Sequence, residues 1–276
     1  MSPYSAYVSG AASGIGRALC LELAKRGSRV LACDLRLAGA EETAHLVEKS
    51  GGRAIARRCD VGVLEQVMAA ADLGERELGP IDFCANNAGI AVSGSIGDIP
   101  IETWRRTVDA NLWGVIHGVH VFTPRFKKLG RGKFLNVSSI AAFMSTPETA
   151  PYNATKAAVF GLSETMSAEL GKWGIDTTVL CPSAVRTSIF EDLAKSALPR
   201  RLAEWQIEGG GPRSAEEIAR RALKAVDRGQ LYLLPQADAR LFWLMKRMMP
   251  RLYTRVVREA RTRGWVEKLL GDPRQD

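Results

Sequence analysis

The stretch Ser5-Ala-Tyr-Val-Ser9-Gly10-Ala-Ala-Ser-Gly14-Ile-Gly16, near the start of the chain, decides the fold class. Its first five residues form a short, largely apolar run of the kind that becomes a buried strand. Three glycines follow with the spacing GxxxGxG, and helical periodicity begins at residue 15. A strand, a glycine-rich turn and a helix in this order predict the first unit of a sheet with parallel strands.

The same alternation continues to about residue 235. The remaining strand candidates cover residues 29–33, 54–59, 81–85, 133–138, 176–180 and 231–234. The helix candidates cover residues 15–26, 39–49, 63–78, 101–128, 152–172 and 214–228, and Ser214 and Glu217 form a capping box at the start of the last one. Most strand candidates are nearly continuous apolar runs, as in sheets that are covered on both faces. We therefore expect an α/β fold with a doubly wound sheet of about seven parallel strands.

The composition is that of a globular protein, and the charge is unevenly distributed. The chain has 276 residues, of which 46% are hydrophobic and 25% charged, which excludes a disordered chain or a coiled-coil rod. Residues 236–276 contain ten Lys and Arg against five Asp and Glu, so +5 of the net charge of +8 lies there and only +3 in residues 1–235. We expect one domain over residues 1–235, with an insertion at 184–213, followed by a basic amphipathic extension over residues 236–276.

Cysteine usage and the first residues predict a cytoplasmic protein. The five cysteines are odd in number, form no CxxC pair and lie mostly in apolar runs. This pattern is typical of reduced thiols in a core rather than of a disulfide framework. Residues 1–10 lack the basic and apolar segments of a signal peptide, and no apolar run approaches the length of a membrane-spanning helix.

The glycine-rich turn predicts a binding site for a dinucleotide. Glycines let the backbone approach a pyrophosphate, which the free N–H groups at the start of a helix can bind. Asp34 ends the second strand candidate, 20 residues beyond Gly14. A carboxylate there accepts hydrogen bonds from the adenosine ribose and repels a 2′-phosphate, which favours NAD over NADP. Ser13 agrees with NAD because it carries no positive charge, whereas Arg36 could fold over a 2′-phosphate.

A second signal is Tyr152-Asn-Ala-Thr-Lys156 at the start of a helix candidate. Side chains four residues apart lie on the same face of a helix. A nearby ammonium favours the phenolate and lowers the pKa of a tyrosine, which otherwise titrates at about 10. The pair follows a strand candidate that ends in Asn136-Val-Ser-Ser139, and ligands bind at the carboxyl ends of strands in such sheets. The pattern therefore indicates a tyrosine that exchanges protons with a bound molecule.

Taken together, these motifs resemble the short-chain dehydrogenase/reductase family in its single-domain, NAD(P)-dependent form. The resemblance covers about residues 4–235 and implies a Rossmann-type fold. The matching segments are Gly10-xxx-Gly14-x-Gly16, Cys59-Asp60-Val61, Asn86-Asn87-Ala88-Gly89, Asn111, Ser139, Tyr152-xxx-Lys156 and Pro182-Ser-Ala-Val-Arg-Thr187. One departure is Ser183, where the family usually has glycine, so the loop near the nicotinamide carries an additional Cβ.

The resemblance implies the roles of the catalytic residues. Tyr152 would donate a proton to a carbonyl oxygen or accept one from an alcohol. Ser139 would hydrogen-bond and polarise that oxygen. Lys156 would lower the pKa of Tyr152 and bind the nicotinamide ribose, and Asn111 would hold a water molecule that links Lys156 to solvent. Ser138 is the neighbouring candidate, but the spacing of 13 residues to Tyr152 favours Ser139.

The resemblance also implies which residues contact the cofactor. Asp60 and Val61 would border the adenine, Asn87 and Gly89 would line the groove, and Val185 would contact the carboxamide. The complete expected set is Gly10, Ser13, Gly14, Ile15, Gly16, Asp34, Asp60, Val61, Asn87, Ala88, Gly89, Tyr152, Lys156, Pro182, Val185 and Thr187. We expect NAD as the cofactor and hold NADP as the alternative.

Residues 184–213 match the place of the family's substrate lid. Apolar side chains there, such as Phe190 and Trp205, indicate an apolar substrate: a steroid, a retinoid, a lipid or an aromatic ketone. The resemblance thus implies an NAD(P)-dependent oxidoreductase that interconverts a secondary alcohol and a carbonyl. In the family the helix at 101–128 often packs against its copy, so we expect a homodimer or homotetramer.

Other readings stay open at this stage. A non-catalytic dinucleotide-binding module could use the same fold, and a membrane-surface protein could act through the basic tail, where Leu241-Phe-Trp-Leu-Met245 lies near arginines. The tail could equally cover a neighbouring subunit or the mouth of the active site. Nucleic acid is not expected, since no nucleic-acid motif is present. His117 and His120 lack further ligands at metal-binding spacing and are expected to be structural, so we expect no metal site.

Overall fold

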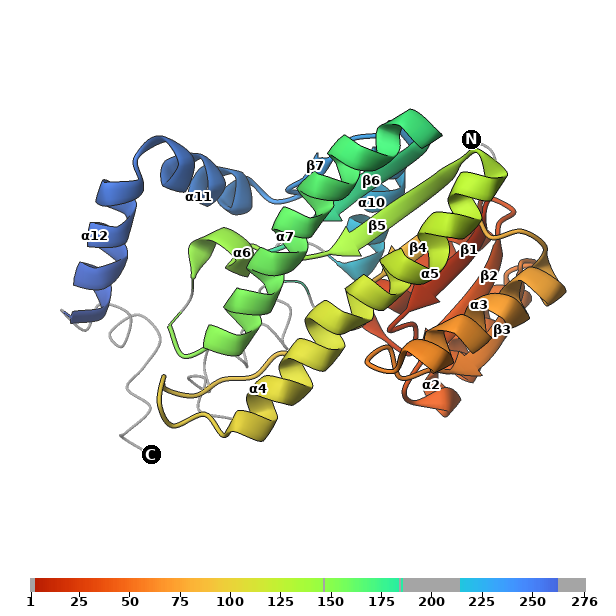
Figure 1. The fold of residues 1–276 in the computed structure, drawn as a ribbon, viewed down its shortest axis with the longest axis horizontal. Helices are drawn as coiled ribbons and strands as arrows, with labels where there is room; N and C mark the ends of the chain where they lie inside the picture. The colour runs from red at the N-terminus through yellow and green to blue at the C-terminus, as the bar shows by residue number, and fades with distance from the viewer. Residues whose placement is uncertain (1–2, 146, 184, 186–213, 263–276) are drawn as a thin grey trace.

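The computed structural model describes residues 3–145, 147–183, 185 and 214–262. Within these residues seven strands form one sheet, and every pair of neighbouring strands is parallel. The strands are Ser5–Ser9 (β1), Arg29–Asp34 (β2), Arg53–Arg58 (β3), Phe83–Asn86 (β4), Gly132–Val137 (β5), Ile175–Leu180 (β6) and Tyr232–Leu233 (β7). The predicted α/β fold with about seven parallel strands is confirmed (Figure 1).

The strand order places a ligand-binding edge at the centre of the sheet. The order is β3-β2-β1-β4-β5-β6-β7, so the chain winds outward from β1 to one edge and then returns to continue on the other side. The direction of winding reverses between β1 and β4. In open parallel sheets ligands bind at the carboxyl ends of the strands on either side of such a reversal.

Helices cover both faces of this sheet. They are Gly14–Ala24 (α1), Leu37–Lys49 (α2), Leu64–Leu78 (α3), Ile101–Val108 (α4), Gly114–Leu129 (α5), Ala141–Met144 (α6), Ala150–Leu170 (α7), Ala215–Asp227 (α10), Ala237–Met248 (α11) and Pro250–Thr262 (α12). One buried cluster joins α1, α2 and α10 to the sheet, and a second joins α3, α5 and α7 to its other face. Of the predicted capping box at the start of α10, the N-cap bond forms: the Glu217 backbone N–H donates to Ser214 Oγ at 3.3 Å, and the Glu217 carboxylate accepts from Arg221.

The helix predicted over residues 101–128 forms without a break from residue 101 to residue 129, but it is not α-helical throughout. The α-helical segments α4 and α5 flank a π-helical turn, Asp109–Trp113 (η1), which contains Asn111. A π-turn accommodates one more residue per turn than an α-helix, and apolar periodicity alone does not reveal it. The consequence for the site is a local rotation of the side chains in this turn.

The described residues beyond β7, up to residue 262, form two further helices, α11 and α12, which lie at the end of the molecule opposite β3 (Figure 1). Their start coincides with the predicted beginning of the extension at residue 236. The insertion predicted at 184–213 lies, except for Val185, outside the described residues. All five cysteines are buried and unpaired. Among the described residues no helix is long and apolar enough to cross a membrane.

Candidate active site

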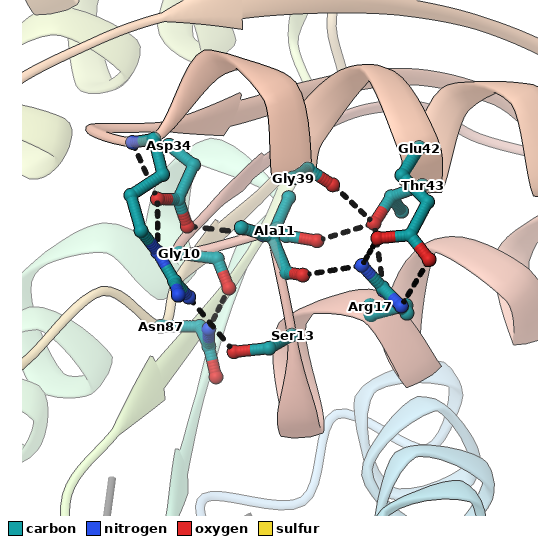
Figure 2. A network of polar contacts seen from close by, with 11 residues as sticks. Gly10, Ala11, Ser13, Arg17, Asp34, Gly39, Glu42, Thr43 and Asn87 are labelled. Carbon is teal, nitrogen blue, oxygen red and sulfur yellow. Dashed lines mark hydrogen bonds and ion pairs between the residues drawn. The ribbon is translucent and has the colours of Figure 1, made fainter. Parts of the chain in front are cut away.

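The glycine-rich turn is tightly packed against the loop that follows β4. Gly10 and Gly14 have φ angles of +66° and +55°, which side chains with a Cβ rarely adopt. A Cβ on Gly16 would lie 2.0 Å from the carbonyl oxygen of Gly10. Asn87 donates from Nδ2 to the carbonyl oxygen of Ser9 at 2.9 Å. It also donates to that of Gly10 at 3.1 Å (Figure 2). The turn therefore requires glycine at these positions, and Asn87 fixes it to the centre of the sheet.

Asp34 lies beside this turn at the end of β2. Its Oδ2 accepts a hydrogen bond of 3.0 Å from the Ala12 backbone N–H, and its Oδ1 accepts one of 2.9 Å from the Arg36 backbone. The Arg36 guanidinium donates to Ser13 Oγ at 3.3 Å. The structure thus brings together Ser13, Asp34 and Arg36, the three residues that are expected to decide between NAD and NADP.

Arg17, which sequence reasoning missed, secures the other side of the turn. Its guanidinium donates to the Ala12 carbonyl oxygen at 2.6 Å and forms an ion pair with Glu42 on α2 (Figure 2). Its Nε donates to Thr43 Oγ1 at 3.0 Å, and Thr43 in turn donates to the Ala11 carbonyl oxygen at 2.8 Å. The position of Arg17 directly after Gly16 was the available signal, but its partners on α2 come from the fold.

The expected adenine-binding residues form a loop after β3. Asp60 Oδ1 accepts a hydrogen bond of 2.9 Å from the Gly62 backbone, and Val61 is buried. His117 on α5 places Nδ1 2.8 Å from the carbonyl oxygen of Val61. His117 is therefore structural, as expected, and holds this loop, whereas His120 is exposed. Among the described residues no group of three or more His, Cys, Asp and Glu side chains is arranged to hold a metal ion.

Tyr152 and Lys156 lie on the first turns of α7 and face the end of β5. The Lys156 ammonium is 5.6 Å from the centre of the Tyr152 ring and donates to the Val137 carbonyl oxygen at 2.9 Å. Tyr152 shares a side-chain hydrogen bond with Ser139, which follows β5. The fold thus brings Ser139, Tyr152 and Lys156 into one cluster at the carboxyl end of the sheet.

The two serines after β5 have different partners. Ser138 donates to the carbonyl oxygen of Lys156 at 2.7 Å and is completely enclosed, with 1% of its surface exposed. Ser139 accepts a hydrogen bond of 3.2 Å from the Ala141 backbone and contacts Tyr152. Ser138 therefore holds α7 against the sheet. Ser139 is the serine whose hydroxyl lies beside Tyr152.

The ionisable pair does not titrate as the Tyr–Lys spacing alone predicts. Burial raises the pKa of Tyr152, and its hydrogen bond with Ser139 acts in the opposite direction. Burial lowers the pKa of Lys156 from 10.5 to about 8. The cost of burying each charge outweighs their mutual attraction, since the ammonium is directed at the Val137 carbonyl rather than at the phenol oxygen.

Asn111 in the π-turn fixes the loop after β4. Its Oδ1 accepts from the Ile90 backbone N–H at 2.7 Å, and its Nδ2 donates to the Ile90 carbonyl at 2.9 Å and to Thr155 Oγ1 at 3.2 Å. A Cβ on Gly89 would lie 2.9 Å from Asn111 Oδ1 and 3.4 Å from Lys156 Nζ. Asn111 thus connects the cofactor-side loop to α7, and Thr155 is a further member that the sequence did not indicate.

The loop after β6 completes the described part of the site. Pro182 accepts a hydrogen bond of 2.9 Å from the Ile140 backbone, and Val185 is buried. The Ser183 backbone donates to Gln236 Oε1 at 3.1 Å, which links this loop to the residue before α11. Of the other expected cofactor residues, Ala88 donates its backbone N–H to Ser9 Oγ at 3.1 Å, and Ile15 packs against the core. Thr187 lies outside the described residues.

Comparison with known proteins identifies the family of the chain. The family model described as short chain dehydrogenase matches residues 5–197. A 1-deoxy-11-beta-hydroxypentalenate dehydrogenase from Streptomyces avermitilis is 32% identical over 245 residues, which cover 87% of both chains. A D-threitol dehydrogenase from Mycolicibacterium smegmatis is 34% identical over 184 residues, covering 67% of this chain and 71% of that protein.

A solved structure gives the same result in three dimensions. A short chain dehydrogenase/reductase from Burkholderia phymatum, in complex with NAD, matches with a TM-score of 0.79 at 28% identity, covering 86% of this chain and 91% of that one. The chain belongs to the short-chain dehydrogenase/reductase family. It is an oxidoreductase of the type that acts on CH–OH groups of small molecules, and the family uses a nicotinamide dinucleotide.

Proposed function

We propose that the protein is an NAD-dependent dehydrogenase/reductase that interconverts a secondary alcohol and a carbonyl on an apolar substrate. The observation that carries this proposal is the cluster of Ser139, Tyr152 and Lys156, assembled beside a glycine-rich turn. A set of this kind serves proton transfer at a substrate oxygen. The cluster lies next to the glycine-rich turn, which suits a dinucleotide. We therefore infer that the proton transfer accompanies a redox reaction.

The chain fits a dinucleotide at that edge. The turn from Gly10 to Gly16 leaves no room for a Cβ at Gly16, so backbone rather than side chains forms the surface there. The backbone N–H groups at the start of α1 suit a pyrophosphate, and Asp34 suits ribose hydroxyls. The buried hydroxyl of Ser183 has no hydrogen-bond partner within the described part of the chain, which makes it available to a ligand beside the loop after β6.

We assign the proton transfer to side chains of the protein, with Tyr152 as the group that exchanges the proton. A bound nicotinamide supplies the hydride donor or acceptor. Tyr152 keeps its proton at neutral pH because burial raises its pKa, so it can donate to a developing alkoxide on a carbonyl substrate. Ser139 polarises the same oxygen by hydrogen bonding. Lys156 places a buried cation beside this oxygen and Tyr152. Asn111 connects the loop after β4 to α7, the helix that carries Tyr152 and Lys156.

We assign NAD rather than NADP from Asp34. Its carboxylate is held in place by the backbone of Ala12 and Arg36 and lies at the ribose side of the turn. A fixed negative charge there repels a 2′-phosphate. Arg36 is directed across Ser13, where its charge is partly offset by Asp34, with 3.9 Å between Nε and Oδ1. We further propose a cytoplasmic homodimer or homotetramer, with residues 184–213 as the substrate lid.

The test is turnover of NAD(H) and NADP(H) with a panel of apolar secondary alcohols and ketones, with the Tyr152→Phe variant as the matched control. We expect turnover by the wild type, loss by roughly 10²–10⁴-fold in the variant, and retained NADH binding by fluorescence. NADH binding without turnover on any panel member would support a non-catalytic dinucleotide-binding module. Full activity of Tyr152→Phe would contradict the assigned mechanism.

A further inference from the structure

The two helices beyond the sheet expose an apolar surface, which we call the tail face. On α11 it comprises Leu241, Leu244 and Met248, at positions i, i+3 and i+7, with 56%, 52% and 70% of their surfaces exposed. Met249, Leu252 and Val256 extend it onto α12, each with 48% exposed. Large apolar side chains on one face of two consecutive helices form a contiguous patch of the kind that marks an interaction site.

The helices that present this face are attached to the body by their opposite side. Trp243 packs on the ring of Tyr232 in β7, with ring centres 5.8 Å apart. Ala239 and Tyr253 are buried, and the Tyr253 hydroxyl donates to the carbonyl oxygen of Met144 in α6. These helices therefore have apolar side chains on two sides, of which only one is used by the described part of the chain.

The two helices that present the tail face are also strongly basic. Residues 237–262 contain seven Lys and Arg against two Asp and Glu, and Arg240, Arg251 and Arg255 are exposed. Lys246 and Arg247 lie instead on the side of α11 that faces α6, where they line, with Phe143 and Trp243, a cavity of about 190 Å³. A helix that binds the surface of an anionic membrane needs exposed apolar side chains and cations near them.

We propose that the tail face docks on the surface of an anionic lipid bilayer. A second copy of the chain is disfavoured as the occupant, because two such faces would bring like charges together. A nucleic acid would use the arginines but leave the exposed leucines and methionines in water. A bilayer interface satisfies both elements, since the apolar side chains enter the acyl boundary while the cations contact headgroup phosphates. The contact is interfacial, because no described helix can span the bilayer.

The experiment is sedimentation of the full chain with vesicles of phosphatidylcholine alone and with an equal part of phosphatidylglycerol. We expect binding only to the anionic vesicles, weakening as salt is added. Leu244→Glu with Met248→Glu should abolish it at every lipid concentration, and Arg251→Glu with Arg255→Glu should weaken it by roughly tenfold or more. Met68→Glu on α3, which replaces an apolar side chain that is 43% exposed, is the matched control and should bind as the wild type does.

The outcomes separate the tail face from the enzymatic site. NADH binding and the thermal midpoint should be the same in all variants, because the substituted side chains are exposed. Failure of the wild type to bind anionic vesicles, or equal binding by Leu244→Glu with Met248→Glu, would overturn the proposal. Light scattering that shows an oligomer dissociated by that variant, without vesicle binding, would instead assign the face to a subunit contact.

Discussion

The hydroxyl of Ser138 donates a hydrogen bond of 2.7 Å to the carbonyl oxygen of Lys156 and so joins the end of β5 to the first turns of α7. The neighbouring Ser139 contacts Tyr152 instead. Two adjacent serines of identical chemistry thus have different partners: one holds helix and sheet together, and the other is the one that we propose to act on the substrate oxygen. The difference between them can be measured.

Ser138→Ala should lower stability, and Ser139→Ala should lower turnover. Removing the Ser138 hydroxyl leaves a buried carbonyl without its partner, which costs about 1–3 kcal/mol of unfolding free energy. Removing the Ser139 hydroxyl deletes a donor at the substrate oxygen, and kcat should fall by roughly 10²–10³-fold with little change in stability. Urea unfolding and steady-state kinetics on both variants test this, and an exchange of the two effects would contradict the assignment of Ser139.

Cofactor choice should shift when the charge of Asp34 is removed. Asp34→Asn keeps the size of the side chain but no longer repels a 2′-phosphate, so kcat/KM with NADP should rise relative to NAD by roughly tenfold or more. Arg36→Ala is the control and should leave the use of NAD nearly unchanged. A wild type that prefers NADP and loses this preference in Arg36→Ala would reverse the assignment.

Lys156 should make stability depend on pH. Burial lowers its pKa from 10.5 to about 8, so between these values the unfolded chain holds a proton that the folded protein has released. The contribution of Lys156 to the free energy of unfolding is therefore least favourable below about pH 8 and improves as the pH rises toward 10.5. The change amounts to on the order of 3 kcal/mol.

The comparison of wild type with Lys156→Met isolates this effect from other titrating groups. Below about pH 8 the substitution should raise the free energy of unfolding, because it removes the cost of burying a charge. The lost hydrogen bond to Val137 lowers that free energy by an amount that does not depend on pH. The net gain should therefore diminish at higher pH. Urea unfolding across this range provides the measurement. A difference that does not change with pH would show that the folded pKa is not lowered.

Asn111 should contribute to stability through its pairing with Ile90. Asn111→Leu leaves the N–H and carbonyl of Ile90 without side-chain partners and should cost about 1–3 kcal/mol of unfolding free energy. Thr123→Val is a suitable comparison, because Thr123 Oγ1 is buried and has no hydrogen-bond partner among the described residues, so its loss should be neutral or stabilising. Equal destabilisation by both substitutions, in urea unfolding, would remove the special role of Asn111.

Local patterns predicted the fold and much of the arrangement at the site. The run from Ser5 to Gly16 indicates a parallel sheet because its strand, turn and helix each have a separate local signature. The spacing of Tyr152 and Lys156 places them together because a helix has a fixed period.

The features that the sequence did not reveal depend on contacts between distant segments. Arg17 meets Glu42 only after α1 and α2 pack together, and Gln236 reaches Ser183 only because β7 lies beside β6. The direction of the Tyr152 pKa shift depends on burial, which spacing does not report. The π-turn likewise leaves no mark in the apolar periodicity.

Because of that π-turn, the number of residues between α4 and α5 cannot change without moving Asn111. Deleting one residue from Asp109–Trp113 would restore a regular α-helix with α4 and α5 nearly in place, but the wide turn that carries Asn111 would be lost. Asn111 would then turn away from Ile90 and Thr155. A surface loop tolerates such a change in length, whereas this segment does not. A one-residue gap here, in an alignment of related chains, would therefore mark a protein whose catalytic cluster is assembled in another way.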